Sequence, residues 1–104
     1  MMISFRRAVL CLAVLTLSSP AFAASKKDKE CGYQADIVAA VQKARLDRVS
    51  ERKVTQTVMA GEVTWPERYN VTIAIFAGEI YKLKMRDLKK TDVGEQWRGA
   101  CLAN

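Results

Sequence analysis

The chain has 104 residues, a formal net charge of +6, three cysteines and no histidine. This length allows one small domain and excludes the large α/β enzyme folds, which need far more chain. The absence of histidine excludes Ser–His–Asp and Cys–His catalysis, histidine metal sites and histidine pH switches.

Residues 1–23 have the three parts of a secretory signal peptide: a positive start with two arginines, an apolar core over residues 8–17, and small residues before the cleavage point. The apolar core is too short to cross a bilayer, which needs about 20 residues. We therefore expect cleavage between Ala23 and Ala24, a bacterial periplasmic or secreted protein, and no transmembrane segment afterwards. Because two arginines leave with the signal, the formal charge falls from +6 to +4.

The cysteines predict a single disulfide. Cys11 lies within the signal and is lost with it, which leaves Cys31 and Cys101 as an even pair in an exported chain. Their bridge would join the two ends of the domain and close a loop of about 70 residues, contributing roughly 4 kcal/mol on the chain-entropy estimate. The pair lacks the Cys-x-x-Cys spacing of redox sites and has too few partners for a metal site.

The first predicted helix runs from Gly32 to about Val49. Before it, residues 24–30 are mostly charged and are predicted to form a disordered leader to a single helical domain over residues 31–104. Helix-forming residues and apolar residues at helical spacing support the helix. Its apolar stripe consists of Tyr33, Ile37, Val38, Val41 and Ala44.

A second, short helix is predicted over residues 51–60. Ser50 is placed to cap it, and Val54 and Val58 give it an apolar side. Gly61 is a natural residue for its end.

One long helix is predicted from Pro66 to about Lys90. Thr64 and Glu67 have the spacing of a capping box, and Trp65 between them is expected to cover the core. The two apolar rows of this helix are Tyr69, Ile73, Phe76, Ile80 and Leu83, and Ala77, Tyr81, Met85 and Leu88.

The β-branched runs within these two segments leave an alternative open. Ala-Gly-Glu follows them at both 60–62 and 77–79, which would give an α+β domain with short hairpins at 54–65 and 70–86. The helical period instead continues through Gly78, with room for a local break there. We therefore predict an all-α domain of about four helices, with one disulfide joining its ends.

A last short helix is predicted over residues 93–102, capped by Thr91 or Asp92. Trp97 and Cys101 then share one face, because they are four residues apart. This spacing predicts an indole packed beside the disulfide.

The inventory of reactive residues favours a binding or structural role over catalysis. No phosphate-binding glycine loop or calcium loop is present, the spacing singles out no catalytic residue or metal ligand, and no cofactor is implied. Nucleic acid is not an expected partner of an exported chain. The densest positive charge lies in residues 82–90, around Asp87, and this basic segment is the predicted contact for an anionic envelope component or protein. Its cations are Lys82, Lys84, Arg86, Lys89 and Lys90.

Three other functions remain open. A homo-oligomer would be favoured by an exposed stripe containing Tyr69, Phe76 or Tyr81. A small hydrolase would need a carboxylate pair such as Glu67 and Glu79. In outline, as an exported helical chain with fewer than a hundred mature residues and one disulfide, the protein resembles the small acid-stress chaperones of the bacterial periplasm. That resemblance implies a chaperone-like role.

Overall fold

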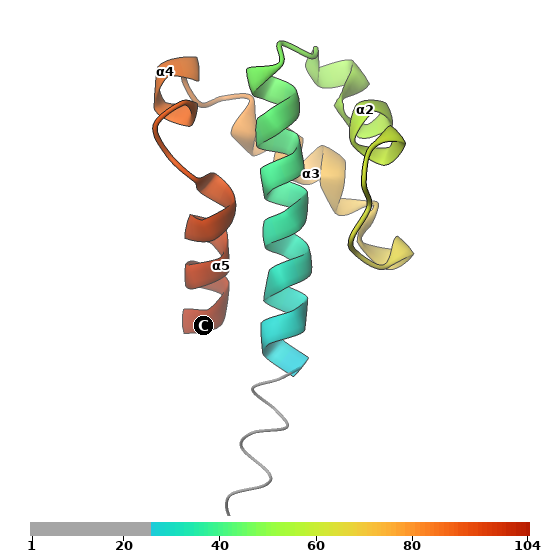
Figure 1. The fold of residues 1–104 in the computed structure, drawn as a ribbon, viewed down its shortest axis with the longest axis vertical. Helices are drawn as coiled ribbons and strands as arrows, with labels where there is room; N and C mark the ends of the chain where they lie inside the picture. Colours follow the sequence, from blue (N-terminus) through green and yellow to red (C-terminus); the bar gives the residue numbers. More distant parts are fainter. Residues whose placement is uncertain (1–25) are drawn as a thin grey trace, which may run out of the picture.

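The computed structural model describes residues 26–104, and every regular element in that range is a helix (Figure 1). A long helix over residues 26–46, which we name the central helix, runs through the middle of the fold, with α5 on one side and α2 on the other. Since residues 26–104 contain no strand, the all-α prediction is confirmed and the α+β alternative is wrong. The signal peptide predicted for residues 1–23 lies outside the described residues.

The central helix begins earlier than predicted. Residues 26–30, predicted to belong to a disordered leader, are helical. Their acidic side chains have partners elsewhere in the fold: Arg98 donates to Asp28 at 3.1 Å, and Arg68 donates to Glu30 at 2.7 Å. Because these contacts join residues that are far apart in sequence, the charged composition of residues 24–30 could not reveal them. The predicted disorder is therefore wrong for residues 26–30.

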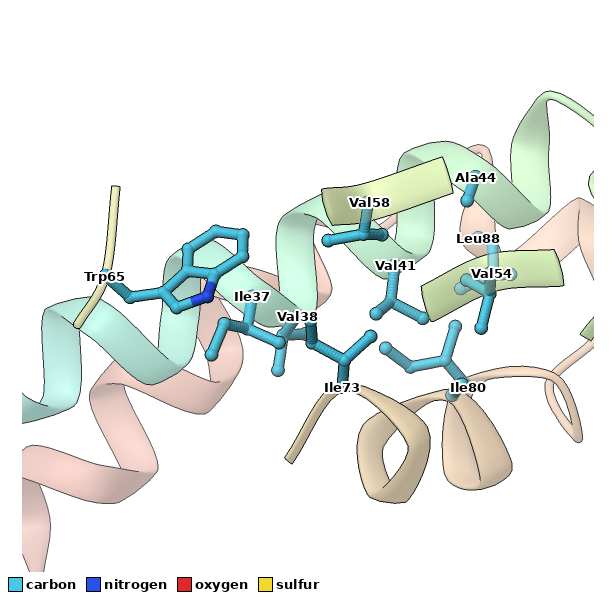
Figure 2. Close-up of a cluster of buried hydrophobic side chains, with 11 residues drawn as sticks. Ile37, Val38, Val41, Ala44, Val54, Val58, Trp65, Ile73, Ile80 and Leu88 are labelled. Carbon is cyan, nitrogen blue, oxygen red and sulfur yellow. The ribbon is translucent and has the colours of Figure 1, made fainter. Parts of the chain in front are cut away.

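The hydrophobic core forms where the central helix meets α2 (Val54–Ala60), α3 (Thr72–Ile80) and α4 (Met85–Leu88). Figure 2 shows side chains from these elements converging. In α3 the buried residues Ile73, Ala77 and Ile80 are separated by four and then three positions, a combination that fits one face of a helix but not one face of a strand. The core side chains are Ile37, Val38, Val41 and Ala44 of the central helix, Val54 and Val58 of α2, Ile73, Ala77 and Ile80 of α3, with Trp65 and Leu88.

The second predicted helix is confirmed. A short 3-10 helix, η1 (Glu51–Lys53), leads directly into α2, which ends at Gly61 as expected. Ser50 holds the extended N-cap position of η1, but its side chain makes no capping hydrogen bond. The start of this helix therefore depends on its buried valines more than on the predicted cap.

The single long helix predicted from Pro66 to Lys90 is wrong. The segment contains a short 3-10 helix, η2 (Glu67–Tyr69), followed by α3, a turn over residues 81–84, and α4. The main break falls after α3, whereas Gly78, where a local break was expected, lies inside α3.

The break after α3 has a tertiary cause. The Tyr81 hydroxyl donates to the carbonyl oxygen of Val49 at 2.7 Å, so α3 has already reached the end of the central helix at this point. A straight continuation would carry the next apolar residues past the core. The turn instead returns Leu88 to the core, where it is 2% exposed.

The segment before η2 packs as predicted at one position and differs at another. Trp65 covers the core, is 6% exposed, and donates from Nε1 to Asn70 Oδ1 at 2.9 Å. The predicted capping box of Thr64 and Glu67 is wrong, because the Thr64 hydroxyl donates to Asp36 Oδ2 at 2.7 Å. That bond ties the segment to the central helix.

The last predicted helix is confirmed as α5 (Val93–Ala103), and Asp92 caps it by accepting from the Glu95 N–H at 3.0 Å. α5 runs antiparallel to the central helix. Its first turn lies against Ala35, and its last turn is tied by the Cys31–Cys101 disulfide, whose Cα atoms are 5.6 Å apart. The predicted bridge between the two ends of the fold is therefore present.

Candidate functional site

The five cations of the basic segment are all exposed, and they do not lie on the single helix that was predicted. They follow the turn over residues 81–84, α4 and the two residues after it. Two of them have only weak ion-pair partners: Lys82 Nζ lies 3.5 Å from Glu79 Oε1, and Arg86 Nε lies 3.9 Å from Asp87 Oδ1. Because these pairs are highly exposed, each contributes little to folding.

A second group of cations, missed by sequence analysis, adjoins the basic segment at the end of the central helix. The Tyr81 hydroxyl bonds to Val49, and the Arg45 guanidinium lies over the Tyr81 ring, 5.2 Å from its centroid. Burial raises the pKa of Tyr81, so this phenol stays protonated as a donor. Figure 1 shows that α4 and the end of the central helix lie at the same end of the molecule, away from the C-terminus.

Arg48 has the most unusual backbone in this region. Its φ of 65° is positive, and no other non-glycine residue in the described part of the chain has a positive φ. The Arg48 N–H donates to Arg45 O and the Val49 N–H donates to Ala44 O, both at 3.0 Å, which is the Schellman pattern at a helix end. Glycine is the favoured residue in this left-handed position, so an exposed arginine here lowers the stability of the turn.

We name the combined surface the basic end and define it as the basic segment together with Arg45 and Arg48. The position of the basic end depends on Gln42, a buried polar residue of the central helix. Gln42 Nε2 donates to Leu88 O at 2.8 Å and to Thr91 O at 2.7 Å, while its Oε1 accepts from the Val93 N–H at 3.2 Å. One side chain thus fixes the chain that leads from α4 into α5.

A shallow, open groove of about 600 Å³ lies beside the basic end, between the central helix and residues 88–92. Its lining includes both Lys89 and Lys90 and the acidic residues Asp47 and Asp92. This mixture of charges, with Asp47 paired to Lys43 at 2.7 Å, shows no preference for one small ligand. The exposed cations of the basic end are therefore a stronger candidate for a binding site than the groove itself.

The two carboxylates considered for a hydrolase lie on different elements. Glu67 is exposed in η2, and Glu79 is exposed near the end of α3. Neither lines the groove beside the basic end. Among residues 26–104, no cluster of three or more metal-ligating side chains could hold a metal ion.

One polar cluster does form near the start of the central helix, and it explains the fold of this region. The Tyr69 hydroxyl donates to Glu30, whose carboxylate also pairs with Arg68 at 2.7 Å. The hydrogen bond from Tyr69, assisted by Arg68, holds the pKa of Glu30 below its ordinary value, and the same bond raises the pKa of Tyr69. These three side chains bond to one another, which is typical of a contact that stabilises the fold.

Trp97 lies beside the disulfide, as predicted. Its indole Nε1 donates to Gln34 Oε1 at 2.9 Å, and that same oxygen is 4.0 Å from Cys101 Sγ. The Phe76 ring packs against Trp97 edge to face, with ring centroids 5.0 Å apart. These contacts join α3, α5 and the central helix around the bridge.

The aromatic residues proposed for a homo-oligomer contact are not exposed as a stripe. Tyr69, Phe76 and Tyr81 are partly buried and pack against the core. Among residues 26–104, the most exposed large apolar side chains are instead Val71, at 75%, and Ile75, at 66%.

None of the helices described between residues 26 and 104 is long and apolar enough to cross a membrane. No protein-family model matches the chain, and neither a curated protein nor a solved structure is similar to it.

Proposed function

We propose that this protein is a small exported binding protein, without catalytic activity, that attaches through its basic end to an anionic partner in the cell envelope or outside the cell. The observation that carries the proposal is Arg48. An exposed positive charge occupies the position where glycine would make the helix end more stable, at the same end of the molecule as five further exposed cations. Backbone strain of this kind is concentrated at functional positions.

The electrostatics of the basic end support the same function. Its ion pairs are exposed and long, so most of the positive charge stays available to a partner. A cluster of one charge sign attracts an oppositely charged surface over a distance of about 10 Å at ordinary ionic strength. Binding of this type should weaken steeply when salt is added.

The proposed location outside the cytoplasm is supported by the Cys31–Cys101 pair, whose Cα separation of 5.6 Å suits a disulfide. Disulfides persist in the bacterial periplasm and outside the cell and are rare in the cytosol. The signal peptide read from residues 1–23 agrees with this compartment.

The test measures binding of the oxidised protein to immobilised dextran sulfate, a polyanion that contains no lipid and no peptide or nucleotide sequence. A triple variant, Lys84→Glu, Arg86→Glu and Lys89→Glu, should bind at least about tenfold more weakly at low salt, because three attractive charges become repulsive. The control variant reverses the same amount of charge at the opposite end of the central helix, by changing Lys26, Lys27 and Lys29 to Glu.

The control separates a local surface from net charge. If the control retains clearly more affinity than the triple variant, the basic end is the binding surface. Equal losses in both variants would show that only the net charge of the chain matters, and the proposed site would be wrong. Absence of binding by the unmodified protein at low salt would contradict the proposed function itself.

A further inference from the structure

α3 exposes apolar residues that nothing in the described chain covers. Residues 70–78 contain no charged side chain, and the buried face of α3 uses only part of this apolar surface. On the other face, Ile75 is 66% exposed, and Val71, the N-cap residue directly before α3, is 75% exposed. A helix that is apolar on nearly all sides normally has a partner on each of them.

The exposed apolar residues share a face with positive charge. Val71, Ile75, Gly78 and Lys82 follow one another at spacings of four, three and four, which places them along one side of α3 and the turn that extends it. A Cβ atom added at Gly78 would meet no atom of another element within 4 Å, so this side of the helix is open at that position. We name Val71 and Ile75 the apolar ridge.

The turn after α3 repeats this combination of apolar and positive residues. Leu83 is 42% exposed, and it stands between Lys82 and Lys84, which are both exposed. Apolar side chains and cations therefore alternate along the surface that leads from the apolar ridge into the basic end.

We infer that the apolar ridge and Leu83 dock into the surface of an anionic phospholipid bilayer, with α3 lying in the plane of the membrane and Lys82 and Lys84 contacting the lipid phosphates. This inference rests on the proposed function and names its partner. Apolar residues on one face of a helix enter the boundary between headgroups and acyl chains, and nearby Lys or Arg residues add attraction to anionic lipids. The two contributions occur here on one continuous segment of chain.

The size of the ridge favours a bilayer over a second copy of the protein. A stable protein dimer buries about 800 Å² on each partner. α3 has nine residues and is only about 13.5 Å long, and its exposed face carries two large apolar side chains. A lipid surface needs no matching shape, and it gains affinity from each nearby cation, so a small ridge is sufficient.

The test compares vesicles of phosphatidylcholine with vesicles that also contain phosphatidylglycerol, using sedimentation with the oxidised protein. The double variant Val71→Gln and Ile75→Gln keeps the net charge and changes only exposed side chains. We expect this variant to bind anionic vesicles about tenfold more weakly than the unmodified protein, because two apolar side chains are lost from the membrane contact. Its binding to dextran sulfate should be unchanged. The matched control, Met59→Gln and Val63→Gln, alters two similarly apolar but less exposed residues elsewhere and should bind vesicles normally.

The outcomes separate this inference from the proposed function. Binding to dextran sulfate without binding to anionic vesicles would overturn the lipid inference and leave the proposed function standing, whereas failure of both would overturn both. Equal vesicle binding by the double variant and the unmodified protein would remove the ridge from the contact. A dimer in solution that the double variant dissociates would identify a second copy as the occupant and would also overturn the inference.

Discussion

Two glycines in α5 allow the packing of this helix to be tested with one substitution made twice. Gly94 is the only residue of α5 that is buried, and a methyl group there would lie 2.9 Å from the carbonyl oxygen of Ala35 and 3.2 Å from Cβ of Ala39. A methyl group at Gly99 would meet no atom within 4 Å. The same change, glycine to alanine, should therefore be less favourable at Gly94 than at Gly99.

The expected magnitudes follow from two effects. Both variants gain about 1 kcal/mol from the higher helix propensity of alanine. Only Gly94→Ala also forces α5 away from the backbone of the central helix, and overpacking of this kind costs about 1–3 kcal/mol. Gly99→Ala should be more stable than the unmodified protein by about 1 kcal/mol, and Gly94→Ala should be less stable than Gly99→Ala by about 1–3 kcal/mol.

Thermal unfolding of the oxidised proteins, followed by circular dichroism, measures this difference. For a domain of this size, 1 kcal/mol corresponds to a shift of roughly 4–8 °C in the unfolding temperature. The two alanine variants should thus unfold several degrees apart, with Gly99→Ala the higher. Equal unfolding temperatures would show that the first turn of α5 does not pack closely on the central helix.

The other predictions concern the disulfide, the buried amide and pH. The mass of the exported protein should be lower by two hydrogens than that of the reduced chain, and replacing Cys31 and Cys101 by serine should lower the free energy of unfolding by about 4 kcal/mol on the chain-entropy estimate. Free thiols in the exported protein would contradict the bridge. Gln42→Leu should cost about 1–3 kcal/mol in a urea titration, because it leaves two carbonyl groups and one N–H without their partner; an unchanged midpoint would refute this role. Since the pKa of Glu30 is lowered on folding, its contribution to stability is complete above its ordinary value of 4.5 and is lost as the pH falls through the folded value. Since the pKa of Tyr69 is raised, its contribution is complete below 10.0 and is lost as the pH rises through the folded value. Glu30→Gln should flatten the acid side of a plot of unfolding temperature against pH, and an unchanged curve would show that this cluster is not coupled to folding.

The helical character of the chain could be predicted because it depends on local spacing. Ile37 and Val41 recur at the helical period and are fully buried, and Asp92 caps α5 as its position indicates. The bridge between Cys31 and Cys101 followed from the even count of cysteines outside the predicted signal peptide. Each of these features is encoded within a few residues or by a pair that has only one way to connect.

The features that sequence analysis missed depend on contacts between distant residues. The break after α3 reflects the bond from Tyr81 to Val49, and Arg98, the partner of Asp28 in the first turns of the central helix, lies 70 residues further along the chain. The sequence indicates the role of Gln42 only weakly. This polar residue lies four positions after the buried Val38, on the side of the apolar stripe. No spacing rule indicates which carbonyl groups such a side chain will meet.

The candidate site was predicted in part. The five cations of the basic segment are exposed, but Arg45 and Arg48 are distant in sequence and join them only through the fold. The left-handed backbone of Arg48 had no signal in the sequence, since glycine or asparagine would be expected in that position.

The central claim is that the positive charge of the basic end serves a partner and not the fold, and Arg48→Gly tests it most directly. Glycine relieves the left-handed backbone, so the variant should unfold at a higher temperature, with a gain of about 0.5–1 kcal/mol. In the same preparation, its binding to dextran sulfate at low salt should weaken severalfold, because one cation of the surface is gone. A variant that is more stable and binds more weakly is the predicted result. A variant that is more stable and binds as tightly as the unmodified protein would contradict the claim.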